Sequence, residues 1–232
     1  IRDCLLSRGL GDVYKRQFLL YAIIVVSAHC GLFLFKKSGK PDFPIIIIIH
    51  KLIKLKVLKI QIAEKKHIKY CKIISETIGS SAKVRGTGIA LRSPDYIQEK
   101  IENNNAIIAT ENGVFAGFCY IEIWGHGKYV AHSGLIVSLN FRGAGLAKKI
   151  KRITFDHSKS KYPKAKIFGI TTALPVMKIN YELGYKPVTF SELTDDDEFW
   201  IGCKTCKNYD VLTRTKREMC LCTGMLYEPK NK

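Results

Sequence analysis

Downstream of the first 58 residues, hydrophobic side chains recur first at every second position and then at every third or fourth. Residues 59–64 (KIQIAE) alternate apolar and polar side chains, as a half-buried strand does. Residues 66–82 carry isoleucines on one stripe, which predicts an amphipathic helix. A second helix is expected to begin at Ser93, because serine caps helix N-termini and Pro94 fits the first helical position.

The middle of the chain predicts three antiparallel strands, over residues 106–111, 114–124 and 129–137. Asn112–Gly113, between the first two, is the strongest short hairpin signal. The later segments are predicted, in order, as a helix over 145–161, a strand over 165–173, a helix over 175–185, and strands over 186–190 and 219–227. This order predicts a mixed α/β (α+β) fold, in which helices cover the faces of a mixed sheet.

The first 58 residues differ in character from the rest. Residues 1–17 resemble translated adapter sequence, so we interpret residues 1–58 as a non-native or disordered N-terminal extension. The alternative is a membrane anchor, because residues 18–35 are almost entirely apolar and basic residues flank them. The remainder is expected to form one main domain over 59–190 and a C-terminal extension over 191–232, with an acidic loop and a cysteine-rich segment packing on that domain.

The formal net charge of +18 favours polyanionic partners such as nucleic acid, anionic lipid or a phosphorylated cofactor, without choosing among them. Two of the eight cysteines, Cys71 and Cys119, lie in apolar periodic segments, as reduced core thiols do. A reducing, cytoplasmic location is therefore expected.

Residues 140–150 (NFRGAGLAKKI) place Gly143 and Gly145 between a predicted strand and a predicted basic helix. Glycines let the backbone approach a ligand closely, and the free amides of a helix N-terminus bind phosphate oxygens. Arg142 and Lys148 add positive charge nearby. Alone, the motif fits either a phosphate cradle or a plain strand-to-helix turn, because short glycine motifs match often by chance.

Two motifs and the order of elements resemble one family. Arg142, Gly145 and Ala147 match the signature Arg/Gln-x-x-Gly-x-Gly/Ala of the GCN5-related N-acetyltransferase (GNAT) family, and residues 180–187 (NYELGYKP) resemble its later helix-to-strand junction. The resemblance covers residues 59–190. It implies a central mixed, mostly antiparallel sheet with a splayed fourth and fifth strand and with helices on both faces.

The resemblance also implies an acyl-CoA-dependent enzyme that transfers its acyl group, typically acetyl, directly to a primary amine. It assigns the pantetheine arm of acetyl-CoA to Leu135, Ile136 and Val137, and a place near the thioester sulfur to Asn180 or Tyr181. The pyrophosphate is assigned to the loop residues Arg142, Gly143, Ala144, Gly145, Leu146 and Ala147.

Three residues are catalytic candidates. Glu122 shares a strand face with aromatic residues and is the first candidate base, directly or through water; the alternative is a strand-end carboxylate paired with a lysine. His132 is a second titratable candidate. Tyr181 is the candidate acid, although Asn180 takes the place where many family members carry tyrosine. A shift of one helical position turns a side chain by about 100°, so Tyr181 is expected to miss the sulfur unless the helix differs.

Segments such as "RGTGIA" and "CYIEIWGHGK" are similar to a bacterial subgroup of acetyltransferases associated with arginine biosynthesis. This resemblance suggests a small-molecule amine acceptor, an amino acid such as glutamate, with Arg85, Lys128 and Lys178 as carboxylate partners. Nucleic acid is not an expected partner, nor is a membrane unless residues 18–35 are native; a homodimer is compatible with the sequence. The alternatives are a basic nucleic-acid-binding protein with a zinc-like C-terminal module and a protein N-terminal acetyltransferase.

Four cysteines gather near the C-terminus, in "CKTC" (Cys203, Cys206) and "CLC" (Cys220, Cys222). Paired short spacings are typical of structural zinc, although one Cys-x-Cys fits less well than two Cys-x-x-Cys pairs. The alternative is a pair of reduced core thiols beside an exposed Cys-x-x-Cys.

Overall fold

The structure, a computed structural model, describes residues 57–85 and 91–229. The interpretations of residues 1–17 and 18–35 lie outside this part of the chain. Among the described residues, no helix is both long and apolar enough to cross a membrane.

A seven-stranded sheet forms the centre of the described chain, in the order β1-β2-β3-β4-β5-β7-β6. Every neighbouring pair is antiparallel except β4 and β5, which run parallel. The strands are β1 (Leu58–Ile62), β2 (Ala106–Glu111), β3 (Val114–Trp124), β4 (Tyr129–Val137), β5 (Lys166–Thr171), β6 (Lys186–Val188) and β7 (Thr223–Tyr227). The hairpin between β2 and β3 turns at Asn112 and Gly113, both at positive φ, as the sequence predicts.

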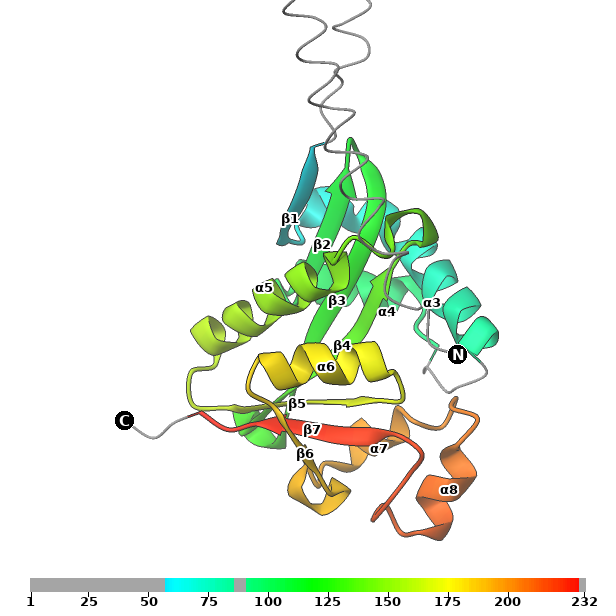
Figure 1. Ribbon diagram of the computed structural model, residues 1–232, viewed down its shortest axis with the longest axis vertical. Coiled ribbons are helices and arrows are strands. Elements are labelled where there is room, and N and C mark those ends of the chain that lie inside the picture. The colour runs from blue at the N-terminus through cyan, green and yellow to red at the C-terminus, as the bar shows by residue number, and fades with distance from the viewer. Residues whose placement is uncertain (1–56, 86–90, 230–232) are drawn as a thin grey trace, which may run out of the picture. The chain divides into compact units, whose positions relative to one another are not determined.

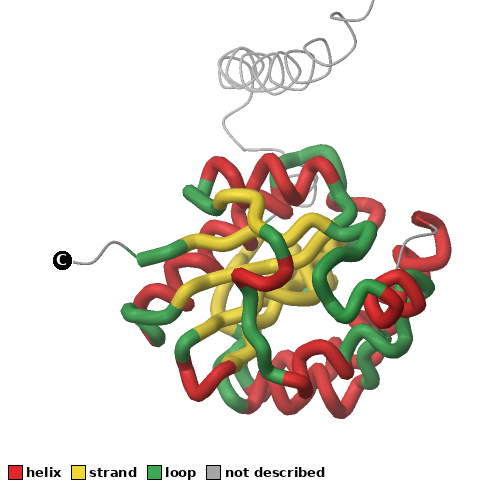
Figure 2. Tube along the Cα trace, turned by 90° about the horizontal axis from the view of Figure 1, so that it is seen from below, coloured by secondary structure: helices red, strands yellow, loops and turns green. Residues whose placement is uncertain are grey.

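Helices cover both faces of this sheet (Figures 1 and 2). One face packs against α5 (Leu146–Lys161) and α6 (Leu174–Glu182), whose apolar side chains join those of the central strands. The other face packs against α3 (Cys71–Arg85) and α4 (Pro94–Glu102) over β3, and against the short helices α7 (Asp197–Ile201) and α8 (Tyr209–Arg214) over β5 and β7. Short 3₁₀ turns complete the fold: η1 (Lys65–Tyr70), η2 (Gly125–Gly127), η3 (Leu139–Phe141) and η4 (Phe190–Glu192). The mixed α/β fold with helices on both faces is confirmed.

The fourth and fifth strands separate after three residue pairs, from Tyr129↔Lys166 to Ala131↔Phe168. Beyond that point β4 pairs only with β3, while β5 continues against β7. A β-bulge in β4 contributes to the separation, because Phe118 of β3 faces Ile136 whereas Tyr120 faces Ser133, which leaves one extra residue in β4. The predicted splay of the fourth and fifth strands is therefore present.

Gly134 lies in this bulge with φ +62°, and a Cβ at this position would stand 2.3 Å from a Tyr120 ring carbon. Only glycine fits so close to a ring in this backbone conformation.

The C-terminal extension is part of the sheet. β7 lies between β5 and β6, so the last strand of the chain completes the sheet formed by the main domain. The strand is shorter than predicted: it begins at Thr223, which leaves Cys220 and Cys222 in the preceding turn and not on a common strand face. Two short helices, α7 and α8, occupy the region where the sequence indicates an acidic loop and a cysteine-rich segment.

Candidate active site

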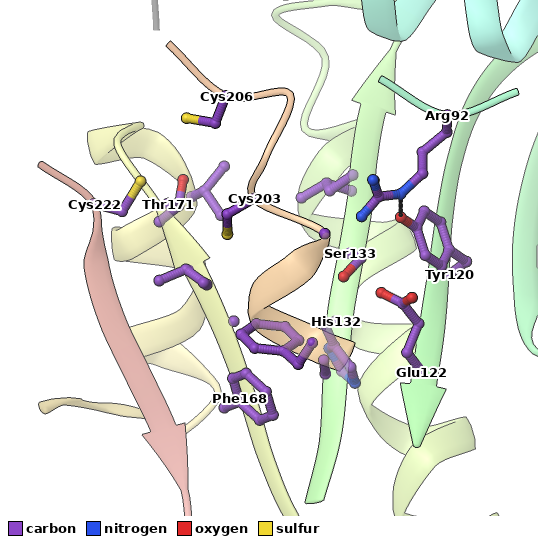
Figure 3. A pocket seen from close by; sticks show the side chains of 18 of the residues that line it. Arg92, Tyr120, Glu122, His132, Ser133, Phe168, Thr171, Cys203, Cys206 and Cys222 are labelled. Carbon is purple, nitrogen blue, oxygen red and sulfur yellow. Dashed lines mark hydrogen bonds between the residues drawn. The ribbon is translucent and has the colours of Figure 1, made fainter. Parts of the chain in front are cut away.

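A cavity of about 430 Å³ occupies the opening between β4 and β5. Its walls come from both faces of the sheet. Lys151 of α5 and Asn180 of α6 line it on one face. Arg92, Tyr120 and Glu122 line it on the other, where Figure 3 shows them together. The separation of the strands therefore lets one cavity pass through the sheet, and a ligand on one face can meet a ligand on the other.

The face that carries α4 presents a hydrogen-bonded polar cluster. Strand alternation sends Tyr120 and Glu122 to the same side of β3, and Tyr96 projects toward them from α4. The Tyr96 hydroxyl donates a hydrogen bond to the Glu122 carboxylate, and the Nε of Arg92 donates to the Tyr120 hydroxyl over 2.8 Å. Burial raises the pKa of both tyrosines well above the usual value, so each phenol stays protonated at neutral pH. The Glu122 side chain is buried, in a residue only 7% exposed overall, and opens onto the cavity.

Two further groups on this wall were not predicted as site residues. Arg92 lines the cavity just before α4, and its guanidinium also stacks 5.1 Å from the centre of the Tyr96 ring. The Nε1 of Trp124 is buried, lines the same cavity and has no hydrogen-bond partner in the described chain. A lone arginine in an irregular segment carries no sequence signal of its own, so only the fold brings Arg92 to the site.

On the face that carries α5 and α6, the buried polar side chains that line the cavity are Lys151, Asn180 and His132. Lys151 is 2% exposed, and burial lowers its pKa to about 8. Asn180 is 1% exposed; its amide donates to the Met225 sulfur over 3.7 Å, and its Oδ1 has no partner in the described chain. A buried acceptor without a partner is costly, so the Asn180 carbonyl is well placed to receive a donor from a ligand.

The other two catalytic candidates, His132 and Tyr181, do not lie beside Glu122. The His132 side chain is buried on the opposite face of the sheet from Glu122, where Nε2 lies 2.8 Å from the Ser158 hydroxyl and Nδ1 lies 3.1 Å from the Tyr185 hydroxyl. Burial, reinforced by nearby Lys151, holds its pKa well below the usual value. Tyr181 is 72% exposed and does not line the cavity, as the one-residue shift predicts.

The glycine loop leads directly into α5. Gly143 and Gly145 have φ of +81° and +72°, and a Cβ at either position would meet nothing within 4 Å. The first amides of α5 follow Gly145, which caps the helix in the left-handed conformation. The loop is thus open toward solvent and presents unpaired helix amides, as an anion cradle requires.

Arg142 makes two hydrogen bonds within the chain that the sequence does not predict. Its Nε donates to the Val137 carbonyl over 2.9 Å, and a terminal nitrogen donates to the Ser81 hydroxyl over 3.0 Å. The side chain therefore connects the end of β4 to α3. The neighbouring Lys148 pairs with Glu182 of α6 at 2.6 Å on the surface.

The backbone of Leu135–Val137 borders the opening. Ile136 and Val137 bury their side chains, whereas Leu135 is half-buried and lines the cavity. Because β5 no longer pairs with β4 here, the polar groups on this edge of β4 have no strand partner. Apart from the Val137 carbonyl, which accepts from Arg142, they can bond a ligand in the opening.

Two of the three predicted carboxylate partners, Lys128 and Lys178, do not lie at the cavity. Lys128 and Lys178 are exposed and are not among the lining residues, and Arg85 ends α3 with a side chain outside the described part of the structure. Arg92 lines the wall of the cavity that carries Glu122.

The four C-terminal cysteines gather around a second, small cavity of about 30 Å³. All four are free thiols, and the backbone N–H of Asn208 donates to the Cys206 sulfur over 3.4 Å. Burial and the neighbouring thiols raise the pKa of Cys203 to about 11 and that of Cys222 to about 12. Within residues 57–85 and 91–229, no three His, Cys, Asp or Glu side chains are arranged to hold a metal ion. Structural zinc stays a prediction.

No protein-family model and no curated protein sequence matches this chain. Solved structures do share its fold. N-acetylglutamate synthase from Neisseria gonorrhoeae, solved with coenzyme A and N-acetylglutamate, is 15% identical over 77% of this chain, with a TM-score of 0.55. This match covers 36% of the synthase chain, so the present chain spans about a third of that relative.

Two smaller proteins match over almost their whole length. Salmonella typhimurium yncA, solved with its cofactor acetyl-CoA, is 16% identical over 76% of this chain and 96% of its own, with a TM-score of 0.52. Diaminobutyrate acetyltransferase EctA from Paenibacillus lautus, solved with L-2,4-diaminobutyric acid and coenzyme A, is 12% identical over 76% and 98%, with a TM-score of 0.52. At these identities the likeness establishes the fold: the chain has the fold of the GNAT acetyltransferases, as its motifs predict.

Proposed function

We propose that the chain is an acyl-CoA-dependent N-acyltransferase, which moves an acetyl group directly from acetyl-CoA to a primary amine. The observation that carries the proposal is the cavity through the sheet, with an open glycine loop at the start of α5 on one side and a buried carboxylate on the other. Two substrates that approach from opposite faces can then react without a covalent enzyme intermediate. The shared fold of the coenzyme A-bound structures supports this proposal.

The coenzyme A half of the site comprises the glycine loop and the free edge of β4. The amides that follow Gly145 would bind the pyrophosphate oxygens, and the backbone of Leu135–Val137 would bond the pantetheine arm. Asn180 offers its unpartnered carbonyl to an amide hydrogen of that arm. An amide of Ile136 or Val137 is the proposed donor to the oxyanion that develops during transfer.

The acceptor half comprises Glu122 and its neighbours. Only a neutral amine attacks a thioester, so a carboxylate that removes the amine proton promotes the reaction. Tyr96 holds the Glu122 carboxylate in place through its hydrogen bond. His132 is hydrogen-bonded to Ser158 of α5 and to Tyr185, and Tyr181 faces solvent. Neither residue is therefore retained in the proposed mechanism.

An amino acid is the acceptor class that this wall favours. Arg92 presents a cation across from Glu122, and the unpartnered indole N–H of Trp124 lies on the same wall. A guanidinium binds a carboxylate through paired hydrogen bonds. One end of the acceptor would thus be anchored while its amine faces Glu122. Glutamate remains the specific proposal that the subgroup resemblance suggests, with Arg92 in the place first assigned to Arg85, Lys128 and Lys178.

The test is a screen of acetyl-CoA consumption over amino acids, polyamines and short peptides. Selective turnover of an amino acid supports the proposal, whereas turnover of peptides alone indicates a protein N-terminal acetyltransferase. Thermal shift separates the enzyme from a nucleic-acid-binding protein, because a ligand that binds the native state raises the unfolding temperature. Stabilisation by an oligonucleotide and not by acetyl-CoA would contradict the proposal. A cytoplasmic location and a homodimer stay predictions.

A further inference from the structure

A buried lysine reaches the opening between β4 and β5 from the face that α5 covers. Lys151 lies in the second turn of α5 and lines the cavity. Its ammonium nitrogen lies 3.9 Å from the point where a Cβ on Gly169 would stand. Gly169 is the first residue of β5 beyond the last pair with β4. Lys151 therefore lies at the vertex of the opening, where the two strands begin to separate.

The positive charge of Lys151 has no counter-charge in its surroundings. Across the described segments no carboxylate forms an ion pair with it, and its nitrogen lies over the Tyr185 ring, 5.4 Å from the ring centre. Burying an unpaired ammonium destabilises a fold. A lysine kept at such a position, facing a cavity, is better explained by a ligand than by packing.

No tyrosine of the described chain occupies this vertex. Tyr181 is 72% exposed, and Asn180 stands in the helical position that faces the cavity. The Tyr185 hydroxyl contacts His132 Nδ1 at 3.1 Å and does not line the cavity. An amide cannot supply a proton to a thiolate. His132 also lines the cavity on this face, but burial and nearby Lys151 hold its pKa well below the usual value, so it is not a protonated donor. Among the described residues, Lys151 is therefore the cationic proton donor on this face.

We propose that Lys151 is the general acid of the acyl transfer, protonating the coenzyme A sulfur as the thioester bond breaks. This inference rests on the function proposed above. In the balanced step the amine nitrogen forms the C–N bond, and the electron pair of the C–S bond moves to sulfur. The amine proton passes to Glu122, the proton of Lys151 passes to the sulfur, and exchange with solvent restores both groups.

The pH dependence of the rate can report the protonation of Lys151, because the titratable groups around it do not change charge in the same pH range. The titratable groups that face it are Cys119 of β3, His132 of β4 and Tyr185 after α6. Burial raises the pKa of Cys119 and of Tyr185 and lowers that of His132, so all three are neutral between pH 7 and 9. Lys151, with its pKa at about 8, changes charge in that window. An acid that must be protonated gives a rate that falls as the pH rises through its pKa.

The experiment compares the full chain with Lys151→Met and, as a matched control on the same helix, Lys159→Met, whose side chain is exposed. Release of coenzyme A thiol from acetyl-CoA is followed from pH 6.5 to 9.5 with a mixture of amino acids, polyamines and peptides as acceptors. Binding of acetyl-CoA is measured by calorimetry. We expect Lys151→Met to bind acetyl-CoA with an affinity within about threefold of wild type and to lose about 100-fold in kcat. We also expect it to lose the alkaline limb of the pH–rate profile, which is the fall in rate as the pH rises through the pKa of Lys151. Lys159→Met should behave as wild type.

The stability of the variant separates a chemical role from a structural one. Because Lys151→Met removes a buried unpaired charge, its unfolding temperature should match or exceed that of wild type. Lys151→Arg keeps a positive charge but cannot release a proton, so it should also be slow. If Lys151→Met binds acetyl-CoA normally and keeps either the wild-type kcat or the fall in rate at alkaline pH, the proposed role of Lys151 is wrong. The proposed function would then still stand. Absence of acetyl-CoA binding by the wild-type chain would overturn the proposed function and this inference together.

Discussion

Ala131 of β4 and Phe168 of β5 form the last backbone pair between these two strands. Past this pair, β5 continues against β7 while β4 continues against β3, so an opening forms inside a continuous sheet. Residues on opposite faces, which a closed sheet would keep apart, then line one cavity. The geometry of this opening explains how Glu122 and Lys151, on different faces, can act on one reaction.

The bulge that opens β4 depends on Gly134. We predict that Gly134→Ala destabilises the fold by about 2–5 kcal/mol, because a left-handed alanine costs about 1–2 kcal/mol and the overlap with the Tyr120 ring adds about 1–3. Gly127→Ala is the matched control: its φ is +85°, but a Cβ there meets nothing within 4 Å, so only the backbone cost of about 1–2 kcal/mol applies. Urea unfolding measures both. Equal losses in the two variants would show that the contact with Tyr120 does not constrain the bulge.

Glu122 is predicted to be the base. Glu122→Gln keeps the size and the hydrogen-bonding oxygen but removes the capacity to accept the amine proton, so kcat should fall by about 10²–10⁴ with acetyl-CoA affinity retained. Glu76→Gln, an exposed carboxylate on α3, is the control and should leave kcat unchanged. A Glu122→Gln enzyme with wild-type kcat would assign the base to another group.

His132 makes stability depend on pH. Because its pKa is lowered in the folded state, the unfolded state binds a proton more readily, and the free energy of unfolding falls as the pH drops below the unfolded value of about 6.5. The slope from this one group should approach about 1.4 kcal/mol per pH unit. Denaturant unfolding between pH 7 and 5 measures it, and His132→Gln should flatten the dependence. The exposed His126→Gln should not.

The C-terminal thiols give a chemical prediction. With the cysteines free, as the structure has them, Cys203 and Cys222 should alkylate slowly at pH 8 and faster by about tenfold for each further pH unit, because the thiolate is the reactive form. Mass spectrometry of peptides after timed alkylation measures this. The competing zinc interpretation predicts stoichiometric metal in protein purified without chelator, and reactivity that appears only after a chelator is added.

Local patterns were sufficient to predict most of the fold. The alternation of residues 59–64, the Asn112–Gly113 turn and the serine–proline start at Ser93 each act over a few residues, and each element forms where it was expected. The place of β7 was not predicted, because insertion of the last strand between β5 and β6 is decided by packing over a long sequence separation. The short helices α7 and α8 were missed for the same reason: their apolar residues are few and find partners only in the assembled core.

The sequence predicts some residues of the candidate site and misses others. The glycine loop has a local signature, and alternation along β3 was enough to select Glu122. Arg92 and Lys151 carry no such signature: one follows an irregular segment, and the other is a single lysine in a lysine-rich helix. Their position at the cavity depends on how α4 and α5 pack on the sheet. A lysine at a position where the helical period requires an apolar residue is the only sequence signal that could have pointed to Lys151.

Calorimetric titration of acetyl-CoA into three forms of the chain tests whether the glycine loop before α5 binds the cofactor. The forms are wild type, Gly145→Glu at the proposed coenzyme A loop, and Gly113→Glu at the β2–β3 turn. Both glycines have positive φ and open space around the Cβ position, so backbone strain is matched. We expect saturable binding by wild type and by Gly113→Glu. In Gly145→Glu the affinity should fall by at least about 100-fold, about 2.8 kcal/mol, from carboxylate–phosphate repulsion. Equal affinity in all three forms, or no binding by wild type, would contradict this expectation.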